Sequence, residues 1–150
     1  MARVNPLEDD DLPHHLSERF SFVEEILGFV PNSLKTMARI PGLVEAFSDL
    51  SSVVLGNSIL PTELRGMISL MVSTGAECRY CQAHTSSSAL QAGVKSEKLS
   101  DIWNFETSSL FTDSEVVALR FAFHAGQIPN AVTDEDTKNL RAHFSDEEIT

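Results

Sequence analysis

Near the middle of the chain, residues 61–74 read Pro61-Thr62-Glu63-Leu64-Arg65-Gly66-Met67-Ile68-Ser69-Leu70-Met71-Val72-Ser73-Thr74. Leucine, methionine, isoleucine and valine recur in this run with helical spacing, and Pro61 suits a first helical turn. Because so many of its positions are apolar, the run predicts a central and largely buried helix.

Helix signals continue on both sides of this run, and no convincing period-two strand interrupts them. Gly28, Gly56 and Gly93 are expected to end helices, while Thr112 and Thr133 are expected to cap them. The predicted helices cover, in chain order, residues 20–27, a short segment from 32, 43–55, 61–74, 78–91, 96–103, and two segments that begin after 112 and 133. The sequence therefore predicts an all-α fold.

The length of 150 residues fits one compact domain, residues 1–150, that buries roughly two thirds of its unfolded surface. We expect residues 1–16 to form a loose acidic opening. The run Ser145-Asp146-Glu147-Glu148 is a capping box, the start signal of a helix, yet the sequence stops at Thr150. We expect this last helix to be cut short, by trimming or by loss of an element that covers apolar surface. Self-association could cover that surface instead.

The formal net charge of -11 argues against a nucleic-acid partner, which would need clustered lysine and arginine, and equally against an anionic membrane surface. The opening residues contain no apolar signal core and no membrane span. Two cysteines are too few for a secreted disulfide scaffold, so we expect a reducing, cytoplasmic compartment.

Both cysteines lie in one short run, Glu77-Cys78-Arg79-Tyr80-Cys81-Gln82-Ala83-His84. If this run is helical, positions three apart share a face and lie about 5 to 6 Å apart, a separation that a disulfide tolerates. The unpaired N–H groups and the dipole of a first helical turn also favour a thiolate. One turn of helix could therefore hold a reversible dithiol.

The same residues also have explanations that involve no redox chemistry. Free cysteine is often a small buried apolar residue, and Cys78, Cys81 and His84 could instead hold zinc with a fourth ligand from elsewhere, although no second ligand pair is visible. We expect Tyr80 to pack and Trp103 to anchor the core.

Three stretches together resemble the alkylhydroperoxidase D-like branch of the carboxymuconolactone decarboxylase superfamily, particularly the proteins called peroxidase-related. Cys78-Arg79-Tyr80-Cys81-Gln82-Ala83-His84-Thr85 resembles its active-site motif. The other two are similar to its amino-terminal signature and to the lead-in of its central helix, Gly28-Phe29-Val30-Pro31-Asn32-Ser33-Leu34 and Leu60-Pro61-Thr62-Glu63-Leu64-Arg65. The similarity runs from about residue 20 to the end of the sequence.

The resemblance implies a helical domain that assembles into dimers, trimers or hexamers, with the cysteine helix beside the central helix. It also implies a thiol-dependent peroxidase for antioxidant defence, in which Cys81 attacks a hydroperoxide and Cys78 condenses with the resulting sulfenic acid. A disulfide reductase that uses the same cysteine pair belongs to the same hypothesis. His84 would belong to the proton relay, and an external thiol would restore the dithiol. No cofactor is predicted. The helix dipole favours the other order, with Cys78 attacking, because that cysteine comes first in the helix.

This chain departs from the family pattern where many members carry a glutamate on the central helix, a position that reads Gly66 here. Glu63 or Glu77 could replace that base. Gly66 also costs about 0.5 to 1 kcal/mol of helix stability, which indicates either close packing or a silent site. His84 falls one residue earlier than in some members, whose histidine position is Thr85 here. A catalytically silent oligomeric module therefore stands beside the peroxidase hypothesis, whereas a lactone decarboxylase fits poorly because those members generally lack the paired cysteines.

Overall fold

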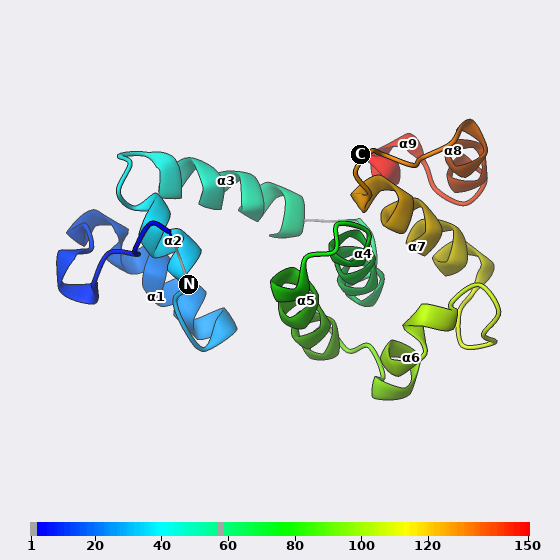
Figure 1. Ribbon diagram of the computed structural model, residues 1–150, viewed down its shortest axis with the longest axis horizontal. Coiled ribbons are helices and arrows are strands. Elements are labelled where there is room, and N and C mark those ends of the chain that lie inside the picture. The colour runs from blue at the N-terminus through cyan, green and yellow to red at the C-terminus, as the bar shows by residue number, and fades with distance from the viewer. Residues whose placement is uncertain (1–2, 57–58) are drawn as a thin grey trace. The chain divides into compact units, whose positions relative to one another are not determined.

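The computed structural model describes residues 3–56 and 59–150, and over those residues the protein is built of helices without strands (Figure 1). The predicted all-α fold is thus confirmed. Contacts divide the chain into two compact units, Met1–Asn57 and Ser58–Thr150. The expected single domain stays a prediction, and each unit is described by itself.

The first unit surrounds a small core made by short helices. Two 3-10 turns, η1 (Asp9–Asp11) and η2 (His14–Leu16), precede α1 (Ser17–Leu27), α2 (Asn32–Met37) and α3 (Leu43–Gly56). The buried side chains come from η2, from each of the three helices and from the residue after α2: Leu16, Phe20, Leu34, Ala38 and Val44. The helices agree with the predicted segments.

The amino-terminal segment is more ordered than the expected loose opening. Leu16 is buried in the core, and Leu7 and Leu12 pack against that core. The Lys35 ammonium also donates to the Asp9 carboxylate, and Arg39 donates to the Asn5 carbonyl at 3.0 Å. Apolar anchoring among the acidic residues, which the charge pattern alone does not reveal, explains the difference.

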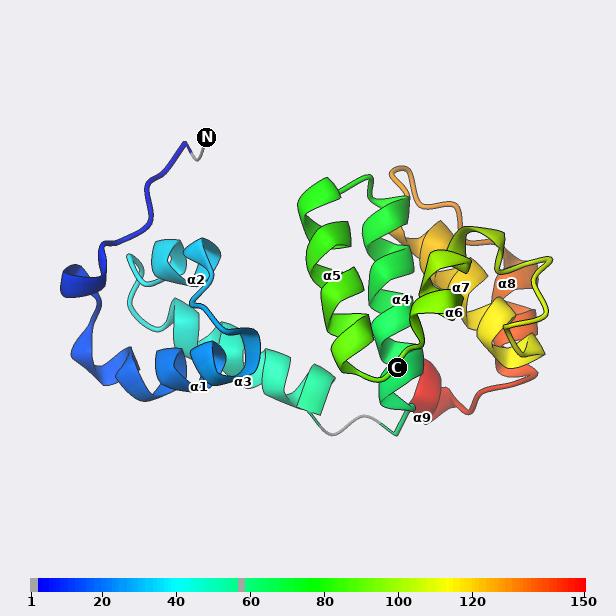
Figure 2. The ribbon, with the colours of Figure 1, turned by 90° about the horizontal axis from the view of Figure 1, so that it is seen from below.

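In the second unit α4 (Thr62–Gly75) packs against α5 (Arg79–Gln91) on one side and α7 (Asp113–Gly126) on the other (Figure 2). α6 (Ser96–Ser100) and the 3-10 turn η3 (Ile102–Asn104) link α5 to α7, and α8 (Asp134–Arg141) and α9 (Asp146–Ile149) follow. Met67 of α4 and Leu119 of α7 are fully buried. The central helix predicted at 61–74 is therefore confirmed.

The backbones of α4 and α7 approach closely where glycine removes the side chain. A Cβ on Gly75 would lie 2.2 Å from the Phe123 carbonyl oxygen, and one on Gly126 would lie 2.4 Å from the Val72 carbonyl oxygen. No real Cβ tolerates such distances, so these two glycines set the spacing of the helix pair.

Side-chain caps begin the last three helices. Thr112, Thr133 and Ser145 each accept a hydrogen bond from a backbone N–H three residues later, and an acidic side chain at that position accepts from the cap's own N–H. The Ser145 box opens the single turn of α9, so the short final helix is present. Ile149 of that turn packs against the core of the second unit.

The prediction that Trp103 anchors the core was wrong. Of the Trp103 surface, 58% is exposed, while the neighbouring Ile102 is fully buried. The 3-10 turn η3 explains why Ile102 is buried and Trp103 is exposed, because consecutive residues of a tight turn point in different directions. Tyr80, expected to pack, is likewise 66% exposed.

Among the helices that the structure describes, none combines the length and the apolar character that a membrane crossing needs.

Candidate active site

The turn between α4 and α5 presents the cysteine pair. After α4 ends at Gly75, the backbone N–H of Cys78 donates to the Ser73 carbonyl at 3.1 Å, which fixes the start of α5 against the end of α4. Glu77, in the turn between α4 and α5, takes a left-handed conformation with φ of 53°. Glycine suits that conformation better than glutamate does, so the backbone is strained immediately before Cys78.

Cys78 and Cys81 are joined by a disulfide, with their Cα atoms 5.3 Å apart. This separation lies within the range of ordinary disulfides and matches the spacing predicted from a helical turn. Cys78 is the N-cap residue of α5, and its Sγ accepts the backbone N–H of Cys81 at 3.3 Å. Both cysteines are half-buried, so the pair is held firmly and remains reachable by a small reactant.

His84 lies one turn after Cys81 on α5 and is half-buried. The Tyr80 and His84 rings are stacked, with centroids 6.2 Å apart and an angle of 14° between their planes. The Thr85 hydroxyl, at the alternative histidine position, donates to the Cys81 carbonyl at 2.7 Å and is thereby committed to the helix backbone. The structure thus brings Cys78, Cys81 and His84 together in the first two turns of α5.

Glu63 lies at the other end of the same helix pair. Its carboxylate Oε1 would lie 3.2 Å from a Cβ on Gly93, just beyond the carboxyl end of α5. Ten residues separate Cys81 from Gln91, the last residue of α5, which is about 15 Å along the helix axis. The structure therefore does not bring Glu63 to the cysteine pair, whereas the exposed Glu77 adjoins Cys78 in the chain.

Of the two explanations for Gly66, close packing and a silent site, the structure supports close packing. A Cβ on Gly66 would lie 2.9 Å from the Cα and 3.1 Å from the Cβ of Ala89, which is fully buried on α5. Glycine at this position lets α4 and α5 approach closely, and a glutamate would have to push α5 away.

Within residues 3–56 and 59–150, no three side chains of histidine, cysteine, aspartate or glutamate are grouped so that they could hold a metal ion. The two sulfur atoms of the hypothetical zinc site are bonded to each other instead.

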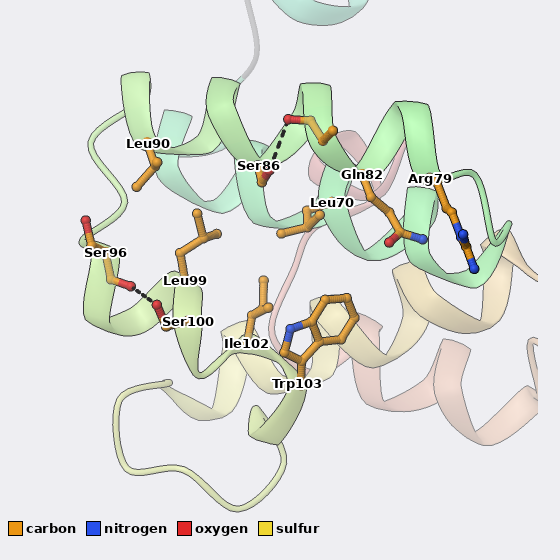
Figure 3. Close-up of a pocket in the computed structure, with 11 residues that line it drawn as sticks. Leu70, Arg79, Gln82, Ser86, Leu90, Ser96, Leu99, Ser100, Ile102 and Trp103 are labelled. Atoms are coloured by element: carbon orange, nitrogen blue, oxygen red, sulfur yellow. Dashed lines mark hydrogen bonds between the residues drawn. The ribbon is translucent and has the colours of Figure 1, made fainter.

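A pocket of about 430 Å³, which was not predicted from the sequence, lies along α5 beside the disulfide. Figure 3 shows Arg79, Gln82 and Ser86 on that helix opposite Leu99 and Trp103. Positions 79, 82, 86 and 90 follow the spacing of one helix face, and a polar run on that face was the signal available in the sequence.

Comparison with known proteins agrees with this architecture. The model of the "Carboxymuconolactone decarboxylase family" matches residues 41–123, more than half of the chain. The uncharacterized protein YnjA of Escherichia coli strain K12 is 30% identical over 93 residues, which cover 62% of this chain. The match spans about half (51%) of YnjA's own length.

Two kinds of solved structure are similar over 99% of the chain. The apo debrominase Bmp8 is 33% identical with a TM-score of 0.89, and 80% of its chain is covered. A cysteine-to-alanine variant of Bmp8 was solved in complex with 2,3,4-tribromopyrrole, at 32% identity, the same TM-score and 79% coverage of its chain. An uncharacterized peroxidase-related protein from Silicibacter sp. TM1040 is 27% identical with a TM-score of 0.79, and 80% of its chain is covered.

Proposed function

Since the chain belongs to the carboxymuconolactone decarboxylase family, we propose that it is a dithiol oxidoreductase whose Cys78–Cys81 pair reduces a small electrophilic substrate. The observation that carries the proposal is the disulfide at the amino end of α5, where Cys78 is the N-cap and Cys81 lies in the first turn of a regular helix. Such a pair can release two electrons and two protons and return to the dithiol through exchange with an external thiol.

A hydroperoxide is the first candidate substrate. One thiolate attacks an oxygen of the O–O bond, the bond breaks, and the alcohol leaves with a proton while the sulfur becomes a sulfenic acid. The second thiol then attacks this sulfur, water leaves, and the disulfide forms. The sum is hydroperoxide plus dithiol giving alcohol, water and disulfide. His84, one turn from Cys81, is the candidate for moving the protons.

Access and protonation support this chemistry. The half-buried cysteines admit a small reactant, and the helix amino end favours the thiolate that must attack. The similarity to a protein described as peroxidase-related points the same way. A reducing, cytoplasmic compartment would supply the thiol partner.

A halogenated aromatic compound is the second candidate, because the chain resembles the debrominase Bmp8 over almost its whole length. Here one thiolate would take the halogen, the ring carbon would keep the electron pair of the broken bond and accept a proton, and the second thiol would release halide as the disulfide forms. The sum is aryl halide plus dithiol giving arene, hydrogen halide and disulfide. Both candidates use the same cysteines and differ in the acceptor of the electrons.

The experiment that separates them gives the reduced protein one equivalent of cumene hydroperoxide or of 2,3,4-tribromopyrrole and follows the thiols by alkylation and mass. Disulfide formation with the hydroperoxide supports the peroxidase, and disulfide formation with bromide release supports the dehalogenase. If both thiols stay alkylatable with either compound, the catalytically silent module replaces this proposal.

We also propose that the protein self-associates. α3 exposes apolar side chains along one side, among them Phe47, Leu50 and Val54 with 45%, 64% and 58% of their surface exposed. Such a stripe is unusual for a helix of a monomer. Light scattering that gives the monomer mass at every concentration would contradict self-association.

A further inference from the structure

The pocket beside α5 is built by two walls of the second unit. Arg79, Gln82, Ser86 and Leu90 form the α5 wall, and the facing wall comes from α6 and η3 (Figure 3). Its volume of about 430 Å³ lies in the range of small-molecule sites. Arg79 lies at one end and Leu90 at the other, eleven residues or about 16 Å apart along the helix.

This pocket is next to the disulfide along α5 but is not lined by it. Residues of an α-helix are rotated by about 100° each, so Cys81 lies about 160° around α5 from both Arg79 and Ala83, which line the pocket. Cys78 directly precedes Arg79 and lies about 40° around the helix from Gln82, another residue of the lining. Neither cysteine lines the pocket. The pocket therefore lies beside the disulfide, with Cys78 at the edge of the helix face that lines the pocket and Cys81 turned away from that face.

The charge of the pocket is unusual for this chain. The formal net charge is -11, and several basic side chains are paired with carboxylates: Arg19, Lys35, Lys98 and Arg120. Arg79 is exposed and, like Lys95 and Lys138, makes no hydrogen bond or ion pair with any other residue that the structure describes; unlike those two lysines it lines the pocket, and no acidic side chain is among the described residues of the lining. Its planar guanidinium is thus available for an anion, and a carboxylate matches its geometry.

Three of the other polar side chains of the pocket already make hydrogen bonds. The hydroxyls of Ser86 and Ser100 donate to carbonyls of their own helices at 3.0 and 2.8 Å, and the Gln82 amide donates to the Ser73 carbonyl at 3.4 Å. The Ser96 hydroxyl and the Trp103 indole N–H also line the pocket, and neither makes a hydrogen bond with any residue that the structure describes. Arg79 is the charged donor of the pocket, so an anionic group on a ligand matches it, and the neutral donors can add hydrogen bonds to the same ligand.

The rest of the pocket is apolar or aromatic. Leu70, Leu90 and Leu99 line it, and Trp103 is presented to it because Ile102 occupies the neighbouring core position. An indole that is 58% exposed offers a ring face to a planar partner. From this arrangement we propose that the pocket binds a small aromatic carboxylate, with Arg79 pairing with the carboxylate and Trp103 contacting the apolar body.

Trp103 makes the test direct, because it is the single tryptophan of the chain and its fluorescence reports on the pocket. The probe is 4-phenylbutanoate, and its neutral counterpart is 4-phenylbutanamide. We expect a saturable fluorescence change with the carboxylate and binding at least about tenfold weaker for the amide, since a charge-assisted pair is lost. Arg79→Gln is expected to weaken carboxylate binding by about tenfold, with Arg79→Lys in between.

Lys138→Gln is the matched control, because Lys138 is exposed on α8 and its replacement removes the same charge outside the pocket. Circular dichroism checks that each variant folds. A Cys78→Ser, Cys81→Ser double variant lacks redox chemistry and keeps the pocket, so binding to it tests the pocket independently of the proposed function. Absence of saturable binding, or equal weakening by Arg79→Gln and Lys138→Gln, would overturn the proposal.

Discussion

The Sγ of Cys78 accepts the backbone N–H of Cys81 at 3.3 Å, so the first cysteine of the pair is the N-cap of the helix that carries the second. The helix amino end therefore acts on Cys78 more strongly than on Cys81, because Cys81 lies inside the first turn and its own N–H is the donor. This relationship predicts which thiol is the more reactive.

In the reduced protein we expect Cys78 to react faster than Cys81 with iodoacetamide at neutral pH. The Cys81→Ser variant, which retains Cys78, should be alkylated several-fold faster than Cys78→Ser. Serine also caps helices, so α5 is kept in both variants. Faster alkylation of Cys78→Ser would assign the attacking role to Cys81, as the family resemblance implies.

Restoring a glutamate to the central helix is expected to destabilise the protein rather than activate it. Gly66→Glu and Gly66→Ala both place a Cβ within 3.1 Å of Ala89, and overpacking of this kind costs about 1 to 3 kcal/mol. Urea unfolding measures the loss. Ala89→Gly removes one of the two close contacts, so it should recover part of the loss in a double variant. A Gly66→Glu protein of unchanged stability and higher peroxide turnover would show that the position is an empty catalytic site.

The close approach of α4 and α7 predicts a second stability difference. Gly75→Ala and Gly126→Ala should each cost several kcal/mol, on the order of a large core substitution, because the new Cβ meets a backbone carbonyl that cannot move aside. Gly56→Ala is the control, since among the residues that the structure describes its Cβ would meet nothing nearer than the Ser52 hydroxyl at 3.8 Å. We expect that control to be neutral or to stabilise α3 by about 0.5 to 1 kcal/mol. Equal effects at the three glycines would contradict the helix spacing.

The acid dependence of stability is expected to involve Asp136. Burial by itself raises the pKa of this carboxyl, but hydrogen bonds from the Thr133 hydroxyl and N–H, together with His124, outweigh burial and lower the pKa from 3.8 to about 2. A pKa that is lower in the folded state adds stability above the unfolded value and loses it as the pH falls. The contribution is therefore present at neutral pH and disappears between about pH 5 and pH 2.

Asp136→Asn should lower the free energy of unfolding at neutral pH by about 2 kcal/mol and flatten its decline over that acid range. Asp134→Asn, at an exposed position in the same turn, is the control and should leave the curve unchanged. Parallel curves for Asp136→Asn and the native protein would rule out this assignment.

Local chemistry made most of the helices predictable. The apolar run at 61–74, the glycine stops and the threonine caps each act over one or two turns, so they can be recognised without the rest of the fold. The cysteine spacing was predictable for the same reason, because three residues of helix set the separation of the two Cα atoms.

Contacts between distant residues could not be predicted in this way. The position of Glu63 near Gly93 follows from the antiparallel pairing of α4 and α5, which puts the start of one helix beside the end of the other. Trp103 was wrongly expected in the core, where Ile102 lies instead, because the choice between neighbouring positions depends on how η3 meets the core. The role of Gly66 likewise needed Ala89, which lies on another helix.

Whether Cys78 and Cys81 form a reactive pair can be read from the intact mass of the protein after treatment with one equivalent of cumene hydroperoxide. The reduced protein is treated, the remaining thiols are alkylated, and the mass is compared with that of an untreated sample. We expect loss of two hydrogens and of both alkylation sites, and no such disulfide in Cys81→Ser. Two thiols that remain fully alkylatable after treatment, both with the hydroperoxide and with 2,3,4-tribromopyrrole, would contradict this expectation.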